Sequence, residues 1–278
     1  MRLRVKTVYL QHASVSHLFP ALRVDYAFLD GQCALDTYRE CENNQPATSR
    51  NVPSPKVLMT GQKKHLVRID NRQTKAIGIA LNTLDDTTTA IQFVTDLINA
   101  GQQLRVRWHP GQSERHTQQY LTAFADMPQV QLSNPKTEPV SDFMANICWL
   151  VAGNSSIHLE AALAGVTPIY YELTPPDNPD YYGYVRHGLS KHACSTAGIV
   201  ELVEAGYGAE GPDAEAVRYY SATYLTEWDC REGELVADIL LGNEVHGVDV
   251  VDLLECPDAQ GRERIDIQYH NLPRACRT

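Results

Sequence analysis

The chain has 278 residues, enough for two small domains or one large one. Its formal net charge of −10 argues against a nucleic-acid surface, because neutralising phosphates needs clustered Lys and Arg. The seven cysteines form no CxxC pair, so neither a disulfide framework nor a zinc knuckle is expected. The longest apolar run is too short to span a bilayer. The basic N-terminal residues are not followed by a long apolar run of the kind found in secretory signals. We therefore expect a cytoplasmic protein without a secretory signal.

The first 72 residues hold short apolar runs separated by turn residues. They predict, in order, a strand at 7–10, a strand at 24–29, a helix at 33–41 and a strand at 56–60. Residues 43–55 are rich in Asn, Pro, Ser and Thr, which is typical of a loop. We expect a short α/β region over 1–72.

From residue 73 onward, strands alternate with helices of about ten residues. The expected strands are 76–81, 103–108, 130–132, 148–152 and 167–171, and the expected helices are 87–100, 117–125, 139–145 and 156–164. This rhythm indicates βαβ units with right-handed crossovers, and hence a doubly wound parallel sheet. We expect this α/β domain over 73–241, with C-terminal helices at 213–241. A tail of 242–278 would hold strands at 248–254 and 264–269.

Ligands of open α/β sheets bind where the strands end, so the loops there are the candidate sites. The first candidate loop is Arg107-Trp108-His109-Pro110-Gly111. Proline disfavours helix for the residue before it, which holds His109 at the strand tip. Its imidazole can donate to a phosphate oxygen or offset charge on a leaving nucleotide. A histidine that only caps a turn is the alternative.

The second candidate loop is Gly153-Asn154-Ser155-Ser156, between a buried strand and a helix. Glycine lets the backbone approach a ligand, and the first N–H groups of a helix attract anions. One serine is enough for a helix cap, so the Asn-Ser-Ser run favours a ligand over plain capping. Glu160, one turn further on, could accept from ribose hydroxyls or lie in solvent.

Two further loops leave alternatives open. Asn82 and Thr83 could contact phosphate or acceptor, or belong to a polar loop before the next helix. The aromatic loop 175–184 could cover the donor, contact an acceptor sugar, form an interface or be plain surface. Carboxylates pair only at Asp85-Asp86 and at Asp177 with Asp180, and no His/Cys ligand spacing occurs, so no metal is expected.

Taken together, the His-Pro pair and the later Ser-Ser pair resemble those of glycosyltransferase-B-like (GT-B-like) bacterial polysaccharide transferases. That group includes teichoic-acid glycerophosphotransferases, polysialyltransferases and capsule Kdo transferases. The resemblance implies two Rossmann-like domains, with a nucleotide-sugar donor, CMP- or CDP-linked, bound in the second. It implies that His109, Ser155 and Ser156 grip the donor phosphate. The other expected donor contacts are Arg107, Asn82, Gly153, Asn154 and Glu160.

The resemblance also implies a glycan or glycolipid acceptor, no separate cofactor, and relatives that act at the inner membrane surface. Peripheral membrane association and an oligomer stay open.

The N-terminal part adds to this resemblance through Tyr9-Leu10-Gln11-His12-Ala13-Ser14 and the strand 57–61. In the family, the histidine of that first turn is a candidate general base, which by position is His12. Ala13 replaces the usual glycine. Asp25 and Asp30 are further base candidates, and either could be a turn residue. Because only about seventy residues precede the linker, the acceptor-side domain is expected to be reduced or incomplete.

Two other functions fit the same fold. A UDP-sugar 2-epimerase or hydrolase would need carboxylates in its cleft for acid/base work, and the loops show no dense carboxylate cluster. A non-catalytic nucleotide-binding subunit would follow from the short N-terminal region.

Overall fold

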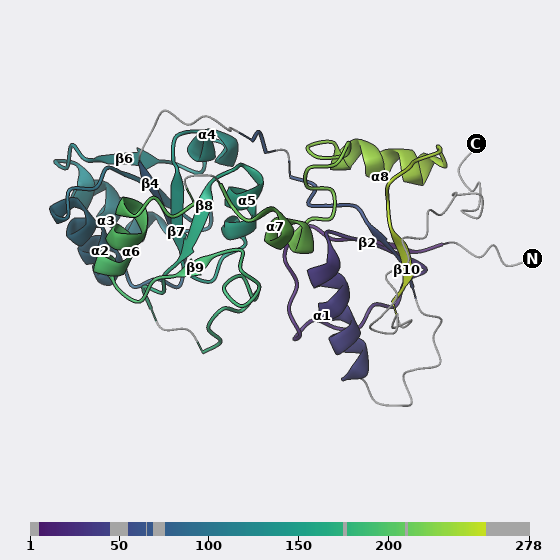
Figure 1. Cartoon of the computed structure of the whole chain (residues 1–278). Helices are drawn as coiled ribbons and strands as arrows, with labels where there is room; N and C mark the ends of the chain where they lie inside the picture. The colour runs from purple at the N-terminus through teal and green to yellow at the C-terminus, as the bar shows by residue number, and fades with distance from the viewer. Residues whose placement is uncertain are drawn as a thin grey trace, which may run out of the picture. The chain divides into compact units, whose positions relative to one another are not determined.

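The computed structural model describes residues 6–44, 55–64, 66–68, 76–174, 177–208 and 211–253. They form two compact units (Figure 1). The large unit is Leu66–Val217. The small unit combines the chain up to His65 with the chain from Arg218 onward.

The large unit contains a six-stranded sheet in the order β6-β5-β4-β7-β8-β9, in which every pairing is parallel. The strands are β4 (Ile77–Leu81), β5 (Leu104–Trp108), β6 (Val130–Ser133), β7 (Trp149–Ala152), β8 (Thr167–Tyr170) and β9 (Lys191–His192). The first strand, β4, lies in the middle. The next two are added on one side and the last three on the other. This is the Rossmann strand order, and the chain changes direction between β4 and β7.

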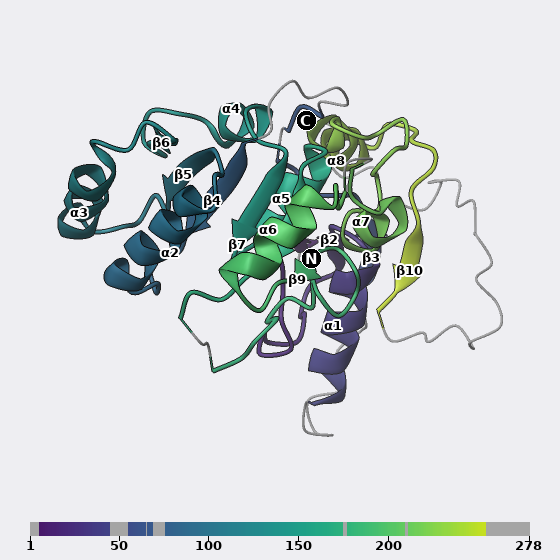
Figure 2. The same cartoon turned by 60° about the vertical axis from the view of Figure 1, so that its left-hand side comes forward.

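Helices cover both faces of this sheet. They are α2 (Thr87–Asn99), α3 (Glu114–Phe124), α4 (Val140–Ala145), α5 (Ile157–Leu163) and α6 (Thr196–Glu204). Successive β7 residues point to opposite faces. Trp149 and Val151 pack with α2, α3 and α6, whereas Leu150 packs with α4 and α5. Figure 2 shows α2 and α6 side by side on their face. Burial on both faces explains why the central strands β4 and β7 are continuous apolar runs.

The small unit contains a four-stranded sheet in the order β1-β2-β3-β10. The strands β1 (Val8–Leu10), β2 (Tyr26–Leu29) and β3 (Lys56–Met59) are parallel, and β10 (Val250–Asp252) is antiparallel to β3. Helix α1 (Gln32–Asn43) packs on the face that carries Ala27 and Leu29. Helix α8 (Glu232–Leu241) packs on the face that carries Phe28. The C-terminal segment therefore supplies one strand and one covering layer of the N-terminal sheet.

The α/β class, with a Rossmann-type parallel sheet and a smaller second α/β unit, is confirmed. The domain boundaries expected at 72/73 and 241/242 differ from the observed grouping, because the chain from Arg218 joins the small unit. The expected helical stretch 213–241 is two helices, α7 (Ala214–Tyr220) and α8. Between them, Leu225 and Cys230 have positive φ, which a helix does not allow.

Strand β9 and helix α6 were not expected from the sequence. The strand expected at 264–269 lies outside the described residues. Among the described helices, none is long and apolar enough to cross a membrane.

Gly61 allows the C-terminal segment to approach the end of β3. Its φ is +71°, and a Cβ on it would overlap Thr223 Oγ1 and lie 2.9 Å from Glu232 Cγ. The Thr223 hydroxyl donates to Glu232 Oε1 at 2.8 Å, and both side chains are buried. Any side chain at position 61 would therefore disturb this packing as well as strain the backbone.

We expect Gly61→Ala to lower the free energy of unfolding by roughly 3 kcal/mol, because overpacking adds about 1–3 kcal/mol to a backbone cost of about 1–2 kcal/mol. Urea denaturation measures the loss. Gly242→Ala is the matched control, because Gly242 belongs to the same unit, has φ +74° and has no atom within 4 Å of its Cβ position. Equal losses in the two variants would contradict the packing role of Gly61.

Candidate functional site

The candidate site lies where β4 and β7 end, at the switch point of the large sheet. Ala80 of β4 is paired with Ala152 of β7, so the two strands end at the same level. The loops that follow are joined by a hydrogen bond of 3.1 Å from Asn82 Nδ2 to the Asn154 carbonyl. The backbone N–H of Asn82 also donates to Asp85 at 2.6 Å. Two of the predicted site residues, Asn82 and Asn154, are thus brought together.

The side chain of Asn154 holds the loop after β8. Its Oδ1 accepts from the Tyr170 hydroxyl and from the backbone N–H of Tyr181, both at 2.9 Å. Its Nδ2 donates to the Asn178 carbonyl at 2.8 Å. The amide that was predicted to contact the donor is therefore used to fix the aromatic loop against the switch point.

His158 holds the loop after β7 from the interior of the large unit. It is fully buried, and its Nε2 donates to the Gly153 carbonyl at 2.9 Å. Because that nitrogen carries the proton, Nδ1 accepts from the Ser190 hydroxyl at 3.0 Å. Burial lowers the pKa of His158 to about 4, so the ring is neutral at pH 7. His158 fixes the position of Gly153.

The two serines differ in what their hydroxyls do. Ser155 Oγ accepts from the backbone N–H of Ile157 at 3.4 Å. Ser156 precedes the first residue of α5, yet its side chain makes no capping hydrogen bond. Both serines are half-buried. The hydroxyl of Ser156 is therefore not used to cap helix α5.

His109 lies at the tip of β5, which flanks β4 on the side opposite β7. Its side chain is exposed, and its Nδ1 accepts from the backbone N–H of Gly111 at 3.0 Å. A neutral ring with Nδ1 as acceptor carries its proton on Nε2. With Nδ1 used in this way, Nε2–H is the ring donor of His109.

Arg107 and Glu160 lie inside the fold. The guanidinium of Arg107 donates to Ser133 Oγ at 2.8 Å and to the Glu138 carbonyl at 3.0 Å, and it lies 5.6 Å from the centre of the Phe143 ring. Glu160 is buried in the first turn of α5. These positions give no support to the prediction that the two side chains contact the donor.

Two carboxyl groups with raised pKa values, Asp85 and Glu172, follow strands at this edge of the sheet. Burial raises the pKa of Asp85 to about 6. Burial, followed by the charge of Asp85, raises the pKa of Glu172 to about 7. Glu172 accepts from the backbone N–H of Asn154, and its Oε1 is buried with no hydrogen-bond partner among the described residues. Glu172 could not be found from a local pattern, because only the strand order brings the end of β8 near the end of β4.

Gly153 is required by this arrangement. A Cβ at position 153 would lie 2.7 Å from Glu172 Oε2. Within the described part of the chain, no group of three or more His, Cys, Asp or Glu side chains could hold a metal ion.

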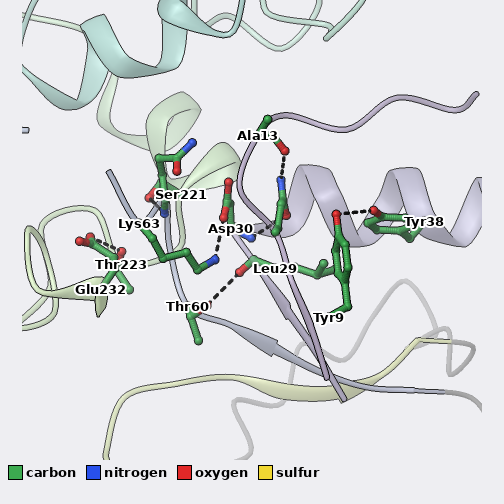
Figure 3. A network of polar contacts seen from close by, with 12 residues as sticks. Tyr9, Ala13, Leu29, Asp30, Tyr38, Thr60, Lys63, Ser221, Thr223 and Glu232 are labelled. Atoms are coloured by element: carbon green, nitrogen blue, oxygen red, sulfur yellow. Dashed lines mark hydrogen bonds and ion pairs between the residues drawn. The ribbon is translucent and has the colours of Figure 1, made fainter. Parts of the chain in front are cut away.

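The remaining predicted residues belong to the small unit. His12 is exposed in the turn after β1. That turn is fixed by Gln11, which donates to the Ala13 carbonyl and accepts from the backbone N–H of Asp30, both at 2.9 Å. Asp30 follows β2, is buried and pairs with Lys63 (Figure 3). Asp25 precedes β2, so it lies at the opposite end of the strand from the predicted site, where it pairs with Lys6.

No protein-family model matches the sequence, and no curated protein does. Among solved structures, the UDP-GlcNAc 2-epimerase from Neisseria meningitidis bound to UDP-GlcNAc is similar, with a TM-score of 0.49 and 12% identity. The calicheamicin glycosyltransferase CalG4 has a TM-score of 0.49 at 14% identity, and the wall teichoic acid polymerase TagF has 0.48 at 10%. The aligned regions cover 79%, 79% and 84% of this chain and 62%, 54% and 67% of those proteins, respectively. At these scores the similarities say nothing about the reaction, and the fold class follows from the strand order itself.

We expect the buried His158 to make the large unit less stable in acid. Its pKa is about 4 in the folded chain and 6.5 when unperturbed, so the unfolded state binds more protons between these values. Stability is therefore full above pH 6.5 and falls as the pH approaches 4. Relative to His158→Gln, wild type should lose about 2 kcal/mol between about pH 7.5 and about pH 5. Urea unfolding at the two pH values measures this difference. His12→Gln, at an exposed position, should keep the wild-type dependence, and an unchanged dependence in His158→Gln would contradict the assignment.

Proposed function

We propose that this chain is a glycosyltransferase, or a polyol-phosphate transferase, that uses a nucleotide-activated donor in bacterial surface polysaccharide synthesis. The observation that carries the proposal is the switch point between β4 and β7, the place where Rossmann-type sheets bind nucleotides. His109 follows β5 and the two serines follow β7, and these strands flank β4 on either side.

The donor phosphates would be held by hydrogen-bond donors that are not already used. His109 is exposed and uses Nδ1 as an acceptor, which leaves Nε2–H as its donor, and the Ser156 hydroxyl does not cap its helix. Such donors stabilise the negative charge that grows on a nucleotide as it leaves. In this proposal the donor is linked to CMP or CDP and the acceptor is a glycan or glycolipid, as the His-Pro and Ser-Ser pairs suggest.

The test is a binding panel of CMP, CDP, UMP, UDP and GDP, measured by calorimetry. We expect the cytidine nucleotides to bind most tightly, and His109→Ala and Ser156→Ala each to weaken binding about tenfold, since a hydrogen bond to a charged group contributes about 1.5–3 kcal/mol. Thr122→Ala is the control, because Thr122 is exposed in the last turn of α3, away from the strand ends. If no nucleotide binds, the donor-site proposal fails.

One observation favours a second function, a UDP-sugar 2-epimerase or hydrolase. Burial raises the pKa values of Asp85 and Glu172 to about 6 and about 7, and the charge of Asp85 contributes to the rise at Glu172. Groups that change protonation near neutral pH suit acid/base catalysis. A uridine preference in the binding panel would favour this function. Turnover of a UDP-sugar that is lost in Asp85→Asn and in Glu172→Gln would establish it.

The raised pKa of Glu172 makes nucleotide binding depend on pH in either of the two functions. This carboxyl is neutral below about pH 7 and negative above it. Because a charged Glu172 would repel a nucleotide diphosphate, we expect the affinity for CDP or UDP to fall as the pH rises through about 7. Glu172→Gln should flatten this fall, whereas Glu201→Gln, on the exposed surface of α6, should not. Calorimetric titrations at several pH values measure the effect, and parallel curves for wild type and Glu172→Gln would contradict it.

A further inference from the structure

A second set of unsatisfied polar groups lies in the small unit, at the carboxyl ends of β2 and β3. Asp30 is 1% exposed, and its Oδ1 accepts from Lys63 Nζ at 2.7 Å. Its other oxygen, Oδ2, is buried with no hydrogen-bond partner among the described residues. The same is true of Oε1 of Gln62, which is 3% exposed. Figure 3 shows Asp30 and Lys63 within the polar network of this unit.

The backbone around these groups is held on several sides. The N–H of Asp30 donates to Gln11 Oε1 at 2.9 Å, and the Asp30 carbonyl accepts from the N–H of Ala222 at 2.8 Å. The N–H of Gln62 donates to Ser221 Oγ at 3.1 Å. A buried acceptor without a partner costs about 1–3 kcal/mol, and more if charged. Asp30 and Gln62 follow the neighbouring strands β2 and β3, so both acceptors lie at one edge of the small sheet, where donors of a ligand could satisfy them.

The charges around the two acceptors favour a neutral ligand. Asp30 faces the charges of Lys63, Lys64 and Glu232. An anion would be repelled by Asp30 and Glu232, and a cation by the two lysines. A hydroxyl group can donate to a carboxylate or amide oxygen and can also accept from an ammonium group. Lys63 has three N–H donors, and one of them goes to Asp30.

We propose that Asp30, Gln62 and Lys63 form a binding site for a neutral polyhydroxylated ligand, a polyol or a sugar. Hydroxyls of the ligand donate to Asp30 Oδ2 and Gln62 Oε1, and one accepts from Lys63 Nζ. That this ligand is the glycan acceptor rests on the proposed transferase function. The binding site itself does not depend on that function.

The test is saturation-transfer NMR on the full chain, with glycerol, glucose and N-acetylglucosamine as probes. We expect at least one probe to bind, and its affinity to fall about tenfold in Asp30→Asn and in Gln62→Met. Asp25→Asn is the matched control. It removes an aspartate that also pairs with a lysine but lies before β2, and it should bind like wild type.

Stability distinguishes a binding role from a structural one. Gln62→Met removes a buried oxygen that has no partner among the described residues, so this variant should unfold at the same urea concentration as wild type or at a higher one. A variant that loses stability while keeping its probe affinity would overturn the proposal. Absence of probe binding in wild type, or equal binding in Asp30→Asn, would also overturn it.

The nucleotide titration on the same samples separates this proposal from the proposed function. We expect wild type and Asp30→Asn to bind nucleotide equally. Probe binding that needs Asp30, in a chain that binds no nucleotide, would leave the polyol site standing and remove the transferase proposal. Nucleotide binding without any probe binding would do the reverse.

Discussion

The hydrogen bond from the Asn82 amide to the Asn154 carbonyl joins two loops that leave neighbouring strands in opposite directions. Asn154, which accepts this bond, is also the residue through which this edge of the large sheet holds its neighbours. Asn154 in turn fixes the loop after β8 through Tyr170 and Tyr181, and His158 holds Gly153 from the interior. Because these groups satisfy one another, the donors left to meet a ligand are on the neighbouring residues of the same edge.

Charge decides what that edge can bind. Glu172 accepts from the Asn154 N–H beside Gly153, and its carboxyl group becomes negative as the pH rises through about 7. In the proposed function, a donor phosphate would lie away from this carboxyl group, toward His109 and Ser156. The small unit presents the opposite case, because the Asp30–Lys63 pair is balanced in charge and leaves acceptors that only a hydrogen-bond donor can satisfy. The two units thus favour ligands of different chemistry.

Local sequence patterns predicted the elements well where those patterns are strong. Buried parallel strands such as β4 and β7 are continuous apolar runs, and α2 has an apolar face that ends at Gly101, so both kinds of element were predicted. Pairing between β3 and β10 joins segments that are far apart in the chain, and no local period encodes it. For the same reason Glu172 was missed. A local pattern also shows that Arg107 ends a strand but not that its guanidinium contacts Ser133 and Glu138.

The most direct measurement is a crystal structure of the chain grown with CDP or UDP. We expect the diphosphate at the switch point of the large sheet, within hydrogen-bond distance of His109 Nε2 and the Ser156 hydroxyl, with the bond between Asn82 and Asn154 intact. A nucleotide bound elsewhere in the large unit, or a diphosphate that contacts neither side chain, would contradict the assignment of this edge as the donor site.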